Sequence, residues 1–152
     1  MLEWIKKRAA EARKQHKHAQ WQAHKARLVE SHSHEFFEQV AALVKQSVEA
    51  FNEEFSEPGR KIEEFERGLD RFVIRRDAPN AVRLECRLDQ AHHIVQYRVT
   101  RTAGVKPRTY QHDASLEFDL SGKNEILLKT SDAVPMTIQQ VSQLLLEPFF
   151  KF

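Results

Sequence analysis

Histidine is the residue type in this sequence that is most suited to metal binding or acid–base chemistry. Five of the eight histidines fall within the first 34 residues. Two histidines bind one metal ion from the same face of a helix only when they are three or four residues apart. No pair among these five has that spacing: His16, His18, His24, His32 and His34. An extended His32-Ser33-His34 segment could chelate, but we expect surface histidines here, with no metal site and no cofactor.

Cys86 is the only thiol, and His93 is placed diagonal to it in a predicted hairpin. A nucleophilic cysteine needs access to solvent and a base that lowers its pKa. The alternating pattern around Cys86 instead directs it inward. The chain also lacks a glycine-rich phosphate loop, a nucleophile elbow and a paired-carboxylate motif. We therefore expect a buried structural cysteine and no enzymatic activity.

A small basic cluster follows in the second half of the chain, at Arg98, Arg101, Lys106 and Arg108. Gly104 and Pro107 predict that Thr102 to His112 is irregular. A loop of this composition can hold an anion or a phosphate backbone, and Tyr97 or Tyr110 can stack on a base. Arg83 and Arg87 alternate with Glu85 and Asp89, which indicates a solvated strand face of mixed charge.

Charge is strongly segregated along the chain, although the net charge is only +2. Residues 1–27 carry eight basic and two acidic side chains, a net +6, whereas residues 28–57 carry seven glutamates against Lys45, a net −6. The basic segment, residues 1–27, should therefore bind an acidic partner or the acidic segment of a second copy. The predicted anion-binding residues are Lys6, Lys7, Arg8, Arg13, Lys14, Lys17, Arg101, Lys106 and Arg108.

The first 57 residues should be helical, since neither proline nor glycine occurs before Pro58-Gly59. A large apolar stripe with steps of three and four is expected to pack on a sheet: Phe36, Val40, Leu43, Val44, Val48, Phe51 and Phe55. Upstream, the same spacing is filled mostly by alanine, and we predict that this Ala seam binds a partner: Ile5, Ala9, Ala12, His16, Ala19, Ala23 and Ala26. Ser33 can cap a second helix, but an unbroken helix fits equally well.

After Gly59 the period changes to two, which is typical of strands with one buried face. Val82, Leu84, Cys86 and Leu88 form one such face, and the run from His92 to Arg101 forms the next strand. A short turn at Gln90-Ala91 would pair Leu84 with Tyr97 and Cys86 with Val95. Further strands are predicted at Leu116–Leu120, Ile126–Lys129 and Phe72–Ile74, with one more possible at Ile62–Phe65.

The chain should close with a helix that begins at a Thr137–Gln140 capping box, supported by a Met136–Val141 staple, and ends at Pro148. Its inward stripe is Ile138, Val141, Leu144 and Leu145. The fold expected is a two-layer α+β domain: a long N-terminal helix or two helices, an antiparallel sheet of about five strands, and a C-terminal helix. We divide the chain into a basic helical arm, residues 1–30, and the α+β domain, residues 31–152.

Function follows from the arm rather than from a catalytic motif. We expect a non-enzymatic protein-interaction module that forms a homodimer, or binds a protein partner, through the basic N-terminal helix. A nucleic-acid-associated protein is the alternative, with the arm and the 98–108 basic loop on phosphates. A ligand pocket between sheet and helices ranks third. A single cysteine, the lack of a secretory signal and the lack of a long apolar run predict a cytoplasmic protein without stable membrane insertion.

Overall fold

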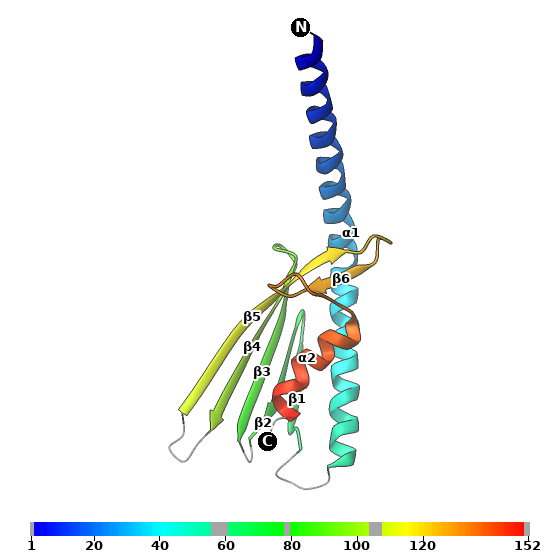
Figure 1. Ribbon diagram of the computed structural model, residues 1–152. Helices are drawn as coiled ribbons and strands as arrows, with labels where there is room; N and C mark the ends of the chain where they lie inside the picture. Colours follow the sequence, from blue (N-terminus) through cyan, green and yellow to red (C-terminus); the bar gives the residue numbers. More distant parts are fainter. Residues whose placement is uncertain (1, 56–60, 78–79, 104–107, 151–152) are drawn as a thin grey trace.

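The computed structural model describes residues 2–55, 61–77, 80–103 and 108–150. A single helix, α1 (Leu2–Glu54), is followed by β1 (Glu64–Gly68), β2 (Arg71–Arg76), β3 (Ala81–Asp89), β4 (Ile94–Ala103), β5 (Arg108–Leu120), β6 (Ile126–Lys129), β7 (Pro135–Met136) and α2 (Ile138–Phe150). The strands form one antiparallel sheet in chain order. Both helices cover the same face of this sheet, and the N-terminal part of α1 extends well beyond it (Figure 1). This arrangement confirms the predicted α+β fold, with seven strands instead of five.

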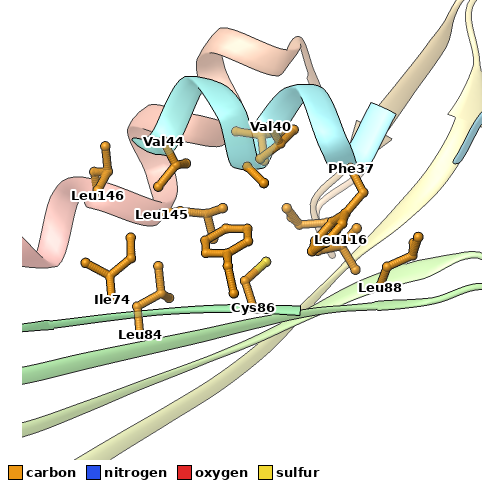
Figure 2. Close-up of a cluster of buried hydrophobic side chains, with 14 of the residues drawn as sticks. Phe37, Val40, Val44, Ile74, Leu84, Cys86, Leu88, Leu116, Leu145 and Leu146 are labelled. Atoms are coloured by element: carbon orange, nitrogen blue, oxygen red, sulfur yellow. The ribbon is translucent and has the colours of Figure 1, made fainter. Parts of the chain in front are cut away.

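The core lies between the two helices and the covered face of the sheet. Figure 2 shows Val40 and Val44 of α1 and Leu145 of α2 facing Leu84 and other residues of the strands. The predicted stripes are largely buried. Steps of three and four put side chains on one side of a helix, alternation puts them on one face of a strand, and these apolar surfaces pack together. Of the predicted α1 stripe, Phe36, Val40, Val44 and Val48 are buried, and Leu43, Phe51 and Phe55 are half-buried.

α1 runs without a break through the segment where a second helix was possible. Ser33 is not a cap: it is a buried residue inside the helix, and its hydroxyl oxygen has no hydrogen-bond partner among the described residues. Buried Val29 and Phe37 lie about one turn to either side of it, so packing on both sides holds this segment helical.

The predicted register of the β3–β4 hairpin is wrong by two residues. Leu84 pairs with Val99, and Cys86 pairs with Tyr97. The loop is longer than the two-residue turn we expected, because Gln90–His93 connects the strands and the Asp89 carboxylate accepts a hydrogen bond from the His92 backbone N–H. A shift of two preserves the side-chain alternation, so the same face is buried as predicted.

Two other segment predictions are corrected. Residues 102–103 and 108–112 belong to β4 and β5 and are not irregular, while Gly104, Lys106 and Pro107 lie outside the described residues. Ile62 precedes β1 and is held instead by the Asn52 side chain, which bonds both its N–H and its carbonyl.

Pro148 does not end α2, which continues to Phe150. A proline this close to a helix end removes only one hydrogen bond, and Phe149 is fully buried just beyond it. At the other end, the Thr137–Gln140 capping box is confirmed by both of its hydrogen bonds.

Candidate functional site

The first part of α1 is an exposed helix that we call the free arm, residues 2–24. Every side chain in it is exposed except those of Ala9 and His24, which are half-exposed. At about 1.5 Å per residue, the free arm is roughly 35 Å long. It contains large apolar side chains that remain in solvent, with Trp4 59% and Trp21 42% exposed. A partner would therefore find both apolar and basic groups on it.

None of the predicted anion-binding residues of the free arm forms an ion pair within the part of the chain that the structure describes. These are Lys6, Lys7, Arg8, Arg13, Lys14 and Lys17, and all are exposed. The predicted Ala seam is also exposed, apart from the half-buried Ala9. The heptad spacing of the seam leads into Ser33, Phe37, Val40 and Val44, which are buried under the sheet, so the seam extends the sheet-facing side of α1.

Along the sheet-covered part of α1, the side of the helix that faces away from the sheet is acidic and open to solvent. Glu35, Glu49 and Glu53 are exposed there, and neither Glu49 nor Glu53 has an ion-pair partner among the described residues. Within the described residues, α1 thus presents bases without ion-pair partners in its free arm, and Glu49 and Glu53 without ion-pair partners near its other end.

The free arm is joined to the body by an ion-pair cluster at the start of the sheet-covered part of α1. Lys25 lies 3.0 Å from the Asp119 carboxylate, which Lys129 also contacts. Partial burial raises the pKa of Asp119, but hydrogen bonds from Lys129, Lys25 and the Leu120 N–H outweigh burial and lower it to about 2. Two lysines on one carboxylate therefore fix the base of the arm.

This cluster predicts a pH-dependent contribution to stability. Because the pKa of Asp119 is lower in the folded than in the unfolded chain, its contribution is complete above about pH 4 and is lost as the pH falls toward 2. We expect the wild-type free energy of unfolding to fall by about 1–2 kcal/mol more than that of Asp119→Asn between these pH values. Urea unfolding of both proteins at each pH measures the difference, and equal losses would contradict it.

His34 has a partner other than a metal ion. Its Nδ1 lies 2.8 Å from Asp70 in the β1–β2 turn, and Arg67 contacts Glu38 beside it, so this group ties α1 to the first hairpin. Among the described residues, no group of His, Cys, Asp and Glu side chains is arranged to hold a metal ion.

Cys86 points into the core and is fully buried, as the alternation predicted. Burial raises the pKa of its thiol far above the ordinary value, so a thiolate is disfavoured. Neither described helix has a segment long and apolar enough to cross a bilayer.

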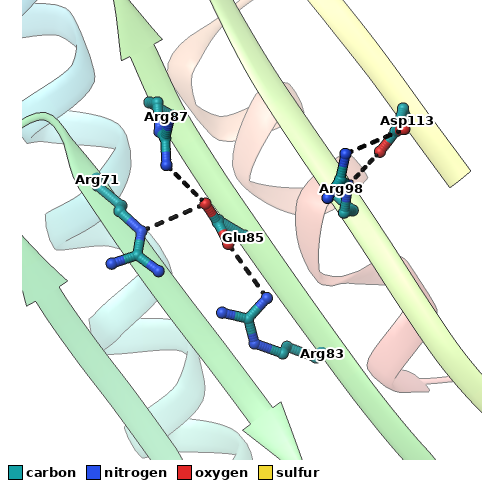
Figure 3. Close-up of polar contacts among 6 residues, drawn as sticks. All are labelled: Arg71, Arg83, Glu85, Arg87, Arg98 and Asp113. Atoms are coloured by element: carbon teal, nitrogen blue, oxygen red, sulfur yellow. Dashed lines mark hydrogen bonds and ion pairs between the residues drawn. The ribbon is translucent and has the colours of Figure 1, made fainter. Parts of the chain in front are cut away.

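The uncovered face of the sheet has many arginines, but each is paired. Figure 3 shows the Glu85 carboxylate contacted by Arg71, Arg83 and Arg87, and Arg98 bound to Asp113. The hydrogen bond to Asp113 raises the pKa of Arg98. This face matches the mixed-charge surface predicted for Arg83 and Arg87.

The predicted 98–108 basic cluster is divided between the two faces of the sheet. Arg98 lies on the uncovered face, whereas the strand register places Arg101 and Arg108 on the helix-covered side together with Tyr97 and Tyr110. Sequence reasoning missed buried Arg76, which donates a hydrogen bond to the Phe149 carbonyl; its position two residues after Ile74 on the same strand face was the available signal.

Comparison of the chain with protein-family models, with curated proteins and with solved structures finds no match.

Proposed function

We propose that this protein is a non-enzymatic interaction module that self-associates through α1, with the basic free arm of one copy on the acidic half of α1 in a second copy. The observation that carries this proposal is the charge reversal along one exposed side of a continuous helix. Within the described chain, few residues of that side have ion-pair partners: Lys25 contacts Asp119, His32 lies near Glu35, and Glu38 contacts Arg67 and His34.

A line of residues seven apart follows the solvent side of α1 through the reversal. It consists of Lys7, Lys14, Trp21, Leu28, Glu35, Ala42 and Glu49. All are exposed except Leu28, which is half-buried. Residues at this spacing share one helix side when two helices supercoil gently. The line is therefore basic at one end, apolar in the middle and acidic at the other end.

Antiparallel pairing about a two-fold axis makes this line complementary to itself. With the axis at Leu28, the two Leu28 side chains meet, and Lys7 of one copy lies opposite Glu49 of the other. A parallel pairing would instead place bases against bases and acids against acids. Charge complementarity thus favours the antiparallel dimer.

The dimer should be weak and sensitive to salt. Exposed ion pairs contribute about 0.2–1 kcal/mol each, and salt screens them over about 10 Å at 0.1 M. We expect dimers at concentrations of about 50 µM in low salt and mostly monomers in about 0.5 M salt.

A charge exchange gives the sharpest test. The variant Lys7→Glu should be monomeric because the introduced carboxylate faces Glu49 of its mate, and Glu49→Lys should be monomeric because the introduced cation faces Lys7 of its mate. An equimolar mixture of the two should form a heterodimer, since each arm then meets an opposite charge. Light-scattering mass on a sizing column in low salt measures all three samples. A monomeric wild type, or a mixture that stays monomeric, would contradict the proposal.

The Ala seam is a second proposed contact surface, on the other side of the arm. Ala19→Glu places a charge in the seam, whereas Ala10→Glu places the same charge outside it. If Ala19→Glu alone dissociates the dimer and the charge variants do not, the seam is the self-association surface instead of the solvent side.

Nucleic-acid binding by the free arm is the second candidate, because its unpaired bases equally fit phosphates. The acidic half of the same helix limits such a contact to the arm. Binding of a single-stranded oligonucleotide should then weaken steeply with salt, and Lys7→Glu/Lys14→Glu should reduce the slope. A slope near zero would contradict this candidate.

A further inference from the structure

The far ends of β4 and β5 lie away from both helices, which leaves part of the covered face open (Figure 1). Next to the C-terminal end of α2, where this open part begins, Val99 pairs with His112 and Arg101 pairs with Tyr110. The four side chains share one side of the sheet because partners in an antiparallel pair point the same way.

These residues surround a pocket of about 330 Å³ near the C-terminal end of α2. Its lining consists of Val99, Arg101, Tyr110, Gln111, His112 and Pro148. Val99 and Pro148 are apolar, Tyr110 is a large exposed ring at 56% exposure, and Arg101 is a half-buried cation. This volume is at the lower end of the range for small-molecule sites.

No carboxylate is among the described residues that line this pocket, so none of them compensates its charge. Arg101 forms no ion pair in the portion of the chain that the structure describes, in contrast to Arg98 on the other face, whose guanidinium binds Asp113. Burial lowers the pKa of Arg76, and the nearby charge of Arg101 lowers it further. The pocket therefore lies in a region of positive potential.

We infer that this pocket binds a nucleotide unit, with the Arg101 guanidinium paired to the phosphate and the Tyr110 ring against the base. A guanidinium matches a phosphate through two parallel hydrogen bonds, and an aromatic ring stacks on any base. Both features are needed: phosphate alone would not use the ring, and an uncharged aromatic ligand would leave Arg101 unpaired. This site is independent of the free arm.

The uncovered face of the sheet is a weaker anion site, although it has more arginines. A ligand there would have to displace Glu85 from three guanidiniums or Asp113 from Arg98. Arg101 needs no such exchange. The unpaired cation, and not the number of arginines, decides between the two faces.

The test is calorimetric titration of the full-length protein with AMP, adenosine and inorganic phosphate in low salt. AMP should bind at least about tenfold more tightly than either fragment, because only AMP engages both Arg101 and Tyr110. Arg101→Gln and Tyr110→Leu should each weaken AMP binding by about tenfold or more.

The matched control is Arg87→Gln, which removes the same charge from an exposed position on the uncovered face. It should leave AMP affinity unchanged within about twofold. Circular dichroism of each variant confirms folding. Equal AMP affinity in wild type and Arg101→Gln, equal weakening by Arg87→Gln, or no binding of AMP at millimolar concentration would each overturn the inference.

An oligodeoxyadenylate of eight nucleotides distinguishes a free nucleotide from a nucleic-acid strand. If it binds no more tightly than AMP and still depends on Arg101, the site takes free nucleotides. If it binds at least about thirtyfold more tightly and Arg101→Gln weakens it, the site takes one unit of a strand.

Discussion

Phe37→Ala should reduce the free energy of unfolding by about 3–5 kcal/mol. The Phe37 ring is fully buried, lies 5.6 Å from the Phe72 ring and has the Arg67 guanidinium 5.4 Å from its centroid. Removal of the ring leaves a cavity where α1 packs on β2, so the packing between the helix and the sheet is weakened. Since small domains are stable by only about 5–15 kcal/mol, a large fraction of total stability is lost.

Urea unfolding followed by circular dichroism measures this loss. Gln46→Ala provides the control, because Gln46 is exposed on the same helix and should change stability by less than about 0.5 kcal/mol. A loss below about 1 kcal/mol for Phe37→Ala would show that α1 does not pack on the sheet as described.

The Cys86 thiol should react with a disulfide reagent at least about a thousandfold more slowly in the folded protein than in the urea-unfolded chain. Full burial excludes the reagent, and it raises the pKa of the thiol so that little thiolate is present. Reaction then requires unfolding, which costs at least about 5 kcal/mol in a typical domain.

The disulfide reagent releases a thiolate of its own when it reacts with a cysteine. The absorbance of that released thiolate, followed at neutral pH, measures the rate of reaction. The variant Gln46→Cys adds an exposed thiol on α1, which should react at the rate of a free cysteine while Cys86 remains protected. Rapid reaction of the wild-type thiol would contradict the orientation of β3 and would reopen a catalytic role for Cys86.

The fold could be predicted from the sequence to the extent that local periodicity determines it. Alternation placed Cys86 in the core and Arg83 and Arg87 on the other face, and apolar steps of three and four identified the buried sides of both helices. The β3–β4 register failed because it depends on loop length, which alternation does not reveal.

The candidate sites were less predictable, because they depend on contacts between distant segments. The sequence identified the basic arm, but not the link from Lys25 to Asp119 that fixes its base. It grouped Arg98 with Arg101 by proximity in the chain, and only the strand register shows that they lie on opposite faces. Whether an arginine is already paired cannot be predicted from spacing alone, and that property distinguishes Arg98, which binds Asp113, from Arg101.

Amide hydrogen exchange of residues 2–24 tests most directly whether a second copy of the chain covers the free arm. A helix without tertiary contacts opens readily, whereas a helix packed in a dimer is protected. In low salt, we predict that these amides exchange at least about tenfold more slowly at 100 µM than at 1 µM protein, while those of β3 exchange equally at both. Exchange of the arm at the same rate at both concentrations would contradict self-association through α1.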